Sequence, residues 1–245
     1  MKNEIERLKN EFENIKKKGW IKSKRQNISG IGYTFEKLLN IDENSISFAD
    51  YNGIEIKTKR YNTRGMITLF SSVPDGDNLF SLIDLYENFG YPNREYPNFK
   101  SLNISVVSNR YTYLKNRKKI ILIVDKEKQK ISLDGYAPNL HFTNVSWSFS
   151  LIENILLRKL NYLAFIKAES KIINNDEHFY YNKITFYKFK NFNNFLNLIE
   201  IGKIRLTIKL GINKTQENFG KMKYHGCSFD INEKDLELLF DKINI

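Results

Sequence analysis

Two acids and a lysine gather in one short segment, residues 50–57, whose sequence is Asp-Tyr-Asn-Gly-Ile-Glu-Ile-Lys. Residues two apart on a β-strand point to the same face, so Glu55 and Lys57 would stand side by side. Asn-Gly is a strong two-residue turn signal, and this turn would bring Asp50 close to Glu55. Two carboxylates beside an ammonium can hold a hard divalent cation and stabilise negative charge on a phosphate.

A β-hairpin is the element expected to position these groups. The turn at Asn52-Gly53 would fold residues 45–50 back against residues 53–59, with Ile54 and Ile56 turned into the core. The alternative is an ordinary solvated strand face, on which an acid and a lysine make only a weak surface ion pair.

A second Glu-x-Lys spacing occurs at Glu169-Ser170-Lys171, after an apolar run. The nearest aspartate before it is Asp134, so this segment lacks the second acid and cannot build the same site locally. We expect it to be a strand end with an exposed ion pair.

A third carboxylate precedes the hairpin. Glu36 lies in an expected short helix, residues 33–39, and faces away from most of the apolar stripe of Phe35, Leu38 and Leu39. It could reach the Asp50 and Glu55 site directly or through metal-bound water; the alternative is an ordinary exposed helix acid.

Composition narrows the class of protein. The chain has 245 residues, 41% hydrophobic content and a formal charge of +11, which favours a polyanionic partner such as nucleic acid. No apolar run is long enough to span a bilayer, and the charged N-terminus does not resemble a secretory signal. The single cysteine, Cys227, cannot form an internal disulfide, so we expect a reducing cytoplasm.

Interleaved strands and helices predict an α/β fold with a mixed central sheet flanked by helices. No composition break divides the chain, so we expect a single domain, with lobes of roughly 1–175 and 176–245. Helices are expected at residues 5–15, 33–39, 79–89, 149–160, 192–199 and 233–243. Strands are expected at residues 66–70, 102–108, 119–125, 130–133, 162–168, 181–189, 204–210 and 224–231.

Two motifs carry a resemblance to a known family. Asp50-x₄-Glu55-x-Lys57, preceded by Glu36 in a Gly-rich helix, resembles the PD-(D/E)xK nucleases, and more narrowly the branch that holds the repair enzyme MutH and the MvaI/BcnI-type restriction endonucleases. Near the end, His225-Gly-Cys-Ser-Phe resembles the His-Gly-x-x-Phe recognition loop of the MvaI/BcnI group. Ala49 stands where the broader pattern has a proline, which supplies no ligand.

The resemblance implies a PD-(D/E)xK core with a DNA-recognition lobe, catalytic roles for Asp50, Glu55, Lys57 and Glu36, and metal binding by Asp50 and Glu55. It implies Mg²⁺-dependent cleavage of double-stranded DNA at a short GC-rich site of CC-x-GG type. Mn²⁺ is expected to substitute for Mg²⁺, and Ca²⁺ to bind without turnover. It also implies a monomer without a protein partner, which cuts the two strands in separate events.

Candidate DNA contacts are the donors that surround these motifs. A Gly-bounded loop contributes Lys221, Lys223, Tyr224 and His225. One face of the expected strand before it contributes Arg205, Thr207 and Lys209. The segment after the expected catalytic strand contributes Lys59, Arg60 and Arg64. Such donors can read base edges or hold phosphates. For His225 the alternative is a loop histidine bonded to backbone, and for the strand face a solvated surface.

A further basic segment, residues 109–119, is expected to be a hairpin end between two strands, either a phosphate clamp or a plain charged turn. Two other functions stay open from the sequence. One is a strand-nicking repair endonuclease of the MutH type, which would share the chemistry. The other is a non-catalytic basic DNA-binding module whose acids only make ion pairs.

Overall fold

The computed structural model describes residues 1–41, 48–75 and 78–244, apart from the side chains of residues 78 and 79. It divides the chain into two compact units between which the chain passes repeatedly. Unit 1 comprises Met1–Ile67, Ile155–Lys190 and Glu237–Ile245, and unit 2 comprises Thr68–Asn154 and Asn191–Leu236. The lobe boundary expected near residue 175 falls inside unit 1, in the turn between two strands.

Unit 1 is built on one mixed sheet. Its strands run in the order β1-β12-β11-β2, and β15 also pairs with β12; β2 and β11 are parallel, and the other pairs are antiparallel. The bounds are Ile21–Lys22 for β1, Glu55–Arg60 for β2, Tyr162–Ile173 for β11, Asp176–Phe189 for β12 and Phe240–Ile243 for β15. The mixed sheet expected from the sequence is therefore present in this unit.

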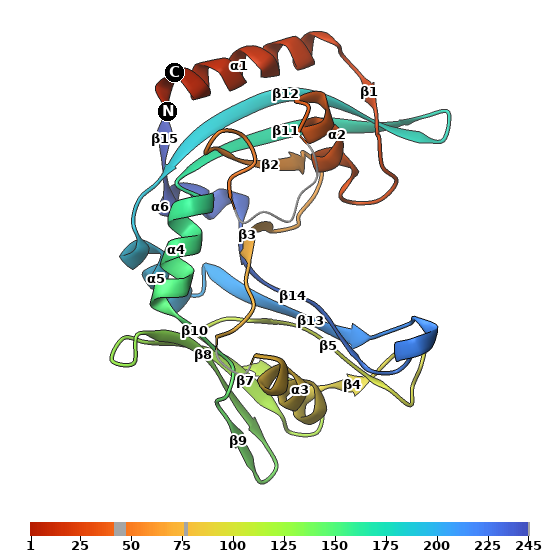
Figure 1. Ribbon diagram of the computed structural model, residues 1–245, viewed down its shortest axis with the longest axis vertical. Coiled ribbons are helices and arrows are strands. Elements are labelled where there is room, and N and C mark those ends of the chain that lie inside the picture. Colours follow the sequence, from red (N-terminus) through yellow and green to blue (C-terminus); the bar gives the residue numbers. More distant parts are fainter. Residues whose placement is uncertain (42–47, 76–77, 245) are drawn as a thin grey trace. The chain divides into compact units, whose positions relative to one another are not determined.

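Unit 1 also contains the helices α1 (Lys2–Lys17) and α2 (Gly30–Leu38), and α1 lies along β12 (Figure 1). The helical spacing of Ile5, Leu8, Phe12 and Ile15 is borne out, because all four are buried in α1. They join the inward side chains of α2 and of the sheet in one apolar core. Ile54 and Ile56 pack into this core, so one face of β2 is buried against it.

Unit 2 contains two five-stranded sheets. The first has the order β3-β14-β13-β5-β4, and the second has the order β10-β8-β7-β6 with β9 paired to β8. Their bounds are Ile67–Ser71 for β3, Tyr91–Pro92 for β4, Lys100–Val106 for β5, Thr112–Tyr113 for β6, Lys119–Asp125 for β7, Lys130–Ala137 for β8, Leu140–Phe142 for β9, Ser146–Ser148 for β10, Ile204–Ile212 for β13 and Met222–Ile231 for β14.

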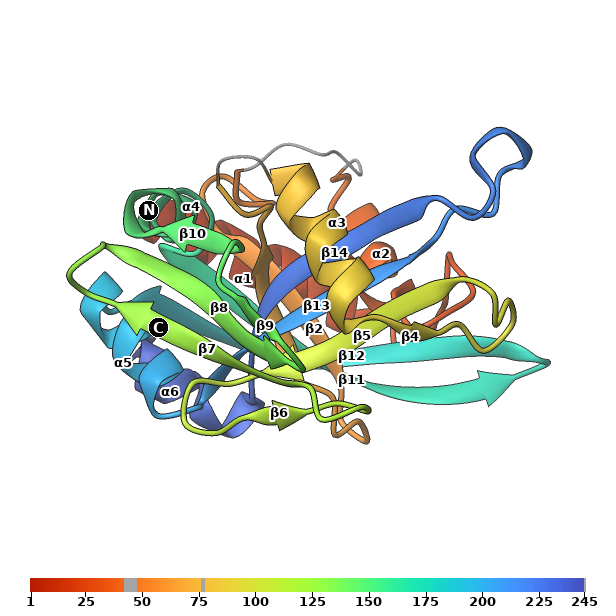
Figure 2. The ribbon, with the colours of Figure 1, turned by 90° about the horizontal axis from the view of Figure 1, so that it is seen from below.

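Helices cover these sheets. In unit 2, α3 (Asn78–Phe89) packs against β5 (Figure 2), and α5 (Phe192–Glu200) packs against β13 and β7. A buried aromatic cluster in this unit consists of Phe70, Trp147, Phe195 and Phe229. The centroid of the Phe229 ring lies 5.1 Å from that of Phe70 and 5.8 Å from that of Trp147. The helix α4 (Phe149–Lys159) passes from unit 2 into unit 1. No helix among the described residues is long and apolar enough to cross a membrane.

The end of the chain differs from the prediction of one helix over residues 233–243. Two short helical turns, η2 (Glu233–Asp235) and α6 (Leu236–Leu239), are followed by β15, in which Phe240 pairs with Phe189 and Ile243 with Phe186. The apolar residues of this segment fit a helical period, but pairing of their backbone with β12 satisfies an otherwise open sheet edge. Tertiary pairing therefore overrides the local pattern.

Three smaller predictions also need correction. The strands β5 and β7, expected to be joined as a hairpin, lie in different sheets. The segment around Glu169 is no strand end, since β11 continues to Ile173. Glu169 accepts a hydrogen bond from Asn182 at 2.8 Å, and the Lys171 ammonium lies 4.0 Å from the centroid of the Trp20 ring, so each side chain has a partner other than the one expected.

Candidate active site

The Asn52-Gly53 turn forms as predicted, with φ of 44° and 87°. Two positive φ angles are what a type I′ turn requires, and glycine adopts them without strain. Tyr51 and Ile54 exchange backbone hydrogen bonds of 3.0 and 2.8 Å across the turn. The phenol of Tyr51 also donates to Glu11 of α1 at 2.9 Å, so the turn is attached to the helix behind it.

The longer hairpin predicted around this turn is not the arrangement that positions β2. Pairing beyond the turn consists of the single bridge between Tyr51 and Ile54 in the described residues, and the first part of the expected strand, residues 45–47, lies outside them. The sheet partner of β2 is instead β11, which runs parallel to it, with Leu163 opposite Glu55. Parallel partners come from distant parts of a chain, so local sequence gives no sign of them.

The alternation of β2 places the acid and the lysine as predicted. Ile54 and Ile56 are buried in the core, and Glu55 and Lys57 share the opposite face. The Lys57 ammonium donates to Oε1 of Glu55 at 2.6 Å. Only 1% of the Glu55 side chain is exposed, against 22% for Lys57, so this pair is no solvated surface contact.

Asp50 is held at the start of the same strand. Its Oδ2 accepts a hydrogen bond of 2.9 Å from the backbone N–H of Ile56. Because β2 is the last strand in the order of its sheet, this bond occupies a donor that β11 does not use. Asp50 lies near enough to Glu55 for its negative charge to raise the pKa of the Glu55 carboxyl.

A second lysine, Lys159, contacts Glu55, and sequence reasoning missed it. Its ammonium lies 3.6 Å from Oε1 of Glu55. Lys159 is the last residue of α4, and three residues later the chain enters β11, whose Leu163 pairs with Glu55. The sequence offers only a basic pair, Arg158-Lys159, at the end of an apolar helix; the parallel pairing that directs Lys159 to the site is a tertiary feature.

Burial dominates the electrostatics of Glu55. It raises the pKa of this carboxyl to about 7, with Asp50 acting in the same direction and Lys57 and Lys159 opposing. Removing a carboxylate from water disfavours its charged form, and here that cost and the repulsion from Asp50 together exceed the attraction of the two ammonium groups. An additional cation next to Glu55 would favour its ionised form.

The residues present fit a hard divalent cation. The second oxygen of Glu55, Oε2, is buried and has no hydrogen-bond partner among the described residues, which is the condition of an oxygen available to a metal. Asp50 supplies the second carboxylate. Mg²⁺ is commonly held by one or two carboxylates and keeps several waters, so two protein ligands suffice.

Glu36 does not complete a cluster of three carboxylates. No group of three His, Cys, Asp or Glu side chains in the described part of the chain could hold a metal together. Glu36 instead lies beside Gly32 and Thr58: a Cβ placed on Gly32 would be 3.7 Å from Oε1 of Glu36 and 3.3 Å from the Thr58 hydroxyl. Of the two routes considered for Glu36, a link through water remains as a proposal.

Comparison with known proteins identifies the family. Residues 9–240 match the sequence model of the MvaI/BcnI restriction endonuclease family. The chain belongs to this family. It is 30% identical to restriction endonuclease MvaI in a complex with cognate DNA, with a TM-score of 0.88 over 99% of this chain and 98% of that one. MvaI without DNA is 29% identical, with a TM-score of 0.62 over the same shares. No curated protein sequence matches the chain.

Membership of the MvaI/BcnI family confirms the resemblance drawn from the two motifs and makes the protein a restriction endonuclease, hence a DNA hydrolase. It also weighs against a non-catalytic DNA-binding module.

The second motif of this MvaI/BcnI endonuclease lies on a strand rather than on the predicted loop. Lys223, Tyr224 and His225 belong to β14, and only Lys221 precedes it. Lys209, Lys223 and His225 line a groove of about 760 Å³ within unit 2, together with Arg94 and polar side chains of β4 and β5. Three of the predicted DNA-binding residues therefore share one basic groove.

His225 owes its place in this groove to Gly211 on the neighbouring strand. A Cβ at position 211 would lie 2.8 Å from Nε2 of His225, so the imidazole occupies space that any other residue would fill. Gly211 itself lines the groove.

Other predicted DNA contacts have structural partners. Thr207 is buried and donates to Asp230 at 2.6 Å, and Nε of Arg205 lies 3.7 Å from the same carboxylate. The half-buried Tyr224 donates to the carbonyl of Ser72 at 3.3 Å, and burial raises its pKa. These three side chains share roles in packing that sequence alone does not reveal.

The basic residues that follow Lys57 divide in the same way, and two of them, Lys59 and Arg60, lie within β2 rather than after it as expected. Arg60 makes two hydrogen bonds of 2.7 Å to Glu177 and a third, of 2.9 Å, to the carbonyl of Ile28. Lys59 is the neighbouring residue of β2 and is half-buried, whereas Arg64 is exposed in the segment that follows. Arg64 is therefore better placed for a phosphate than Arg60.

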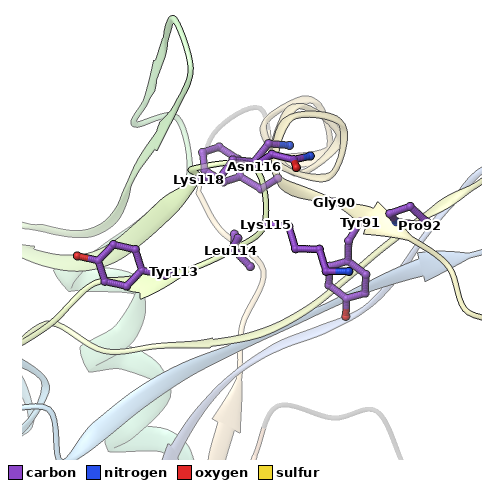
Figure 3. A pocket seen from close by; sticks show the side chains of 9 residues that line it. Gly90, Tyr91, Pro92, Tyr113, Leu114, Lys115, Asn116 and Lys118 are labelled. Carbon is purple, nitrogen blue, oxygen red and sulfur yellow. The ribbon is translucent and has the colours of Figure 1, made fainter.

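A separate cavity of about 450 Å³ lies in unit 2, between the α3–β4 connection and the loop after β6 (Figure 3). Tyr91, Tyr113 and Leu114 line it together with Lys115 and Lys118 of the predicted basic segment. Its lining residues carry no carboxylate, so it offers no metal site.

Proposed function

We propose that this protein is a Mg²⁺-dependent type II endonuclease that cuts both strands of double-stranded DNA at a specific short site. The observation that carries the proposal is the buried carboxylate of Glu55, bonded to Lys57 on one oxygen and open on the other, with Asp50 held beside it. Similarity to MvaI, which was solved with its cognate DNA, supports DNA as the substrate.

The family supports the finer features of this proposal. We infer a GC-rich target of CC-x-GG type, read by a monomer that cuts each strand in a separate event. Unit 1 carries Asp50, Glu55 and Lys57 and would be the catalytic unit. Unit 2 carries the basic groove and would recognise the DNA.

Each residue has a task in phosphodiester hydrolysis. Glu55 and Asp50 would hold Mg²⁺, with Mn²⁺ as a substitute and Ca²⁺ as an inert replacement. When bound, Mg²⁺ polarises a phosphate oxygen and lowers the pKa of water. Lys57, on the same strand face as Glu55, would orient the attacking water and offset the charge that grows on the phosphoryl oxygens. Glu36 would act through water at the edge of this site.

A plasmid digest tests the proposal. The wild-type protein should linearise a plasmid in Mg²⁺ and leave it intact in EDTA. Glu55→Ala should lose about three orders of magnitude in rate, since the metal contributes several kcal/mol to charge stabilisation. Glu169→Ala is the matched control, because Glu169 has the same Glu-x-Lys spacing on a neighbouring strand, and it should cut normally.

Two outcomes would overturn parts of the proposal. Undiminished cutting by the Glu55→Ala protein would remove the assigned site. Open circles that persist without linear product would indicate a nicking enzyme of the MutH type. Sequencing the ends of the linear product would give the target site.

A further inference from the structure

Glu55 is held by two cations on one of its oxygens. Lys57 donates to Oε1 at 2.6 Å, and the Lys159 ammonium lies 3.6 Å from the same atom. The first contact is a hydrogen bond, whereas the second is an ion pair beyond hydrogen-bond distance. Lys159 is therefore the more weakly attached of the two.

When Glu55 is ionised, as metal binding requires, the two ammonium groups of Lys57 and Lys159 match the two carboxylates of Asp50 and Glu55 in number. A divalent cation that reaches the open Oε2 of Glu55 adds two positive charges next to both ammonium groups. Because Glu55 is almost fully buried, the repulsion between the cation and the ammonium groups is screened less than it would be in water, so one ammonium should leave.

Lys159 is the group able to move. It lies at the end of α4 on a flexible four-carbon stem, and 26% of its side chain is exposed, so it has water to move into. Lys57 lies on β2 and is hydrogen-bonded to Glu55, so it is held more firmly than Lys159. The Lys159 ammonium at the end of α4 can thus move away from the Glu55 carboxylate on β2.

We propose that Lys159 is a positioning residue that holds Glu55 in the metal-free enzyme and competes with the divalent cation for it. The proposal rests on the proposed function, because it takes Asp50 and Glu55 as the metal ligands. In this proposal the last residue of α4 lowers the affinity of the site for the divalent cation.

Binding of Mn²⁺ to the full-length protein tests this without any cleavage reaction. Free Mn²⁺ is measured by electron paramagnetic resonance during a titration. Lys159→Met should bind Mn²⁺ roughly tenfold more tightly than the wild type, because one competing charge is gone. Lys159→Arg should stay near the wild-type affinity. Lys188→Met is the matched control: it removes one exposed charge from β12 in the same unit and should change nothing.

The outcomes separate this inference from the proposed function. Unchanged or weaker Mn²⁺ binding by Lys159→Met would overturn the role of Lys159 while leaving the metal site in place. A wild-type protein that binds no Mn²⁺ and cuts no DNA would overturn the proposed function itself. Lys159→Gln is the second variant should the Met protein fail to fold, as judged by thermal unfolding, and the same tightening is expected of it.

Discussion

The Asp50 carboxylate and the backbone N–H of Ile56 are joined by a hydrogen bond of 2.9 Å. This bond ties the acid before the turn to the strand after it. In the proposed function the other oxygen of Asp50 would bind the metal, so this side chain would have both a structural and a chemical task.

Two substitutions at position 50 should separate these tasks. Asp50→Asn keeps an oxygen that accepts from Ile56 but loses the charge, so it should abolish Mg²⁺-dependent cutting with little loss of stability. Asp50→Ala loses both and should also lower the free energy of unfolding by about 1 kcal/mol. Urea unfolding and plasmid digestion measure the two effects. Equal stability of the two variants would show that the hydrogen bond contributes nothing.

Metal affinity should depend on pH through Glu55. Burial raises the pKa of its carboxyl to about 7 from an ordinary value of 4.5. Since a metal binds the ionised form, Mn²⁺ affinity should fall as the pH drops from about 8 to about 6, with one proton taken up for each metal released. High Mg²⁺ should move the pH profile of cleavage toward lower pH. A flat Mn²⁺ affinity over this range would contradict the prediction.

The raised pKa of Glu55 also makes the stability of the fold depend on pH. A carboxyl whose pKa is higher in the folded than in the unfolded protein stabilises the fold below the unfolded pKa, and this contribution is lost as the pH rises through 7. As the pH rises from 4.5 to about 7, the free energy of unfolding of the metal-free protein should therefore fall by on the order of 3 kcal/mol because of this group. Glu55→Gln should not show this loss, which thermal unfolding at several pH values can check.

Gly211→Ala should weaken DNA binding through His225. The added methyl group would lie within 2.8 Å of Nε2 of His225 and displace the ring. His225→Ala should weaken binding to a comparable degree, by about 1–3 kcal/mol if the ring reads a base. The double variant should be no worse than His225→Ala, as gel-shift titrations can show. Fully additive losses would mean that the two residues act separately.

Arg60→Met should affect stability more than DNA affinity. Arg60 is paired with Glu177 through two hydrogen bonds of 2.7 Å and is only 13% exposed. Its loss leaves Glu177 without this partner and should cost roughly 1–3 kcal/mol of folding free energy. Arg64→Met, at an exposed position, should leave stability unchanged and reduce the salt dependence of DNA binding if it contacts a phosphate. Chemical unfolding and salt titrations distinguish the two arginines.

Much of the local structure could be predicted because it depends on neighbouring residues. The Asn52-Gly53 turn follows from backbone preferences, and the shared face of Glu55 and Lys57 follows from strand alternation. The helix over residues 2–17 follows from the spacing of its buried side chains. The Asp-x₄-Glu-x-Lys motif and the His225 segment likewise indicate the family through residue types and spacing alone.

Tertiary structure decided what the turn and the strand do. The parallel pairing of β2 with β11 gives the strand its sheet partner, and the end of α4 brings Lys159 to the buried carboxylate of Glu55. The same kind of long-range pairing made a strand of residues 240–243. Sequence patterns report periodicity within a segment, whereas contacts between segments far apart in the chain depend on which sheet edges and buried surfaces meet when the whole core forms. The types and faces of the candidate catalytic residues were thus set locally, whereas the burial of Glu55 and its contact with Lys159 arose only from the complete fold.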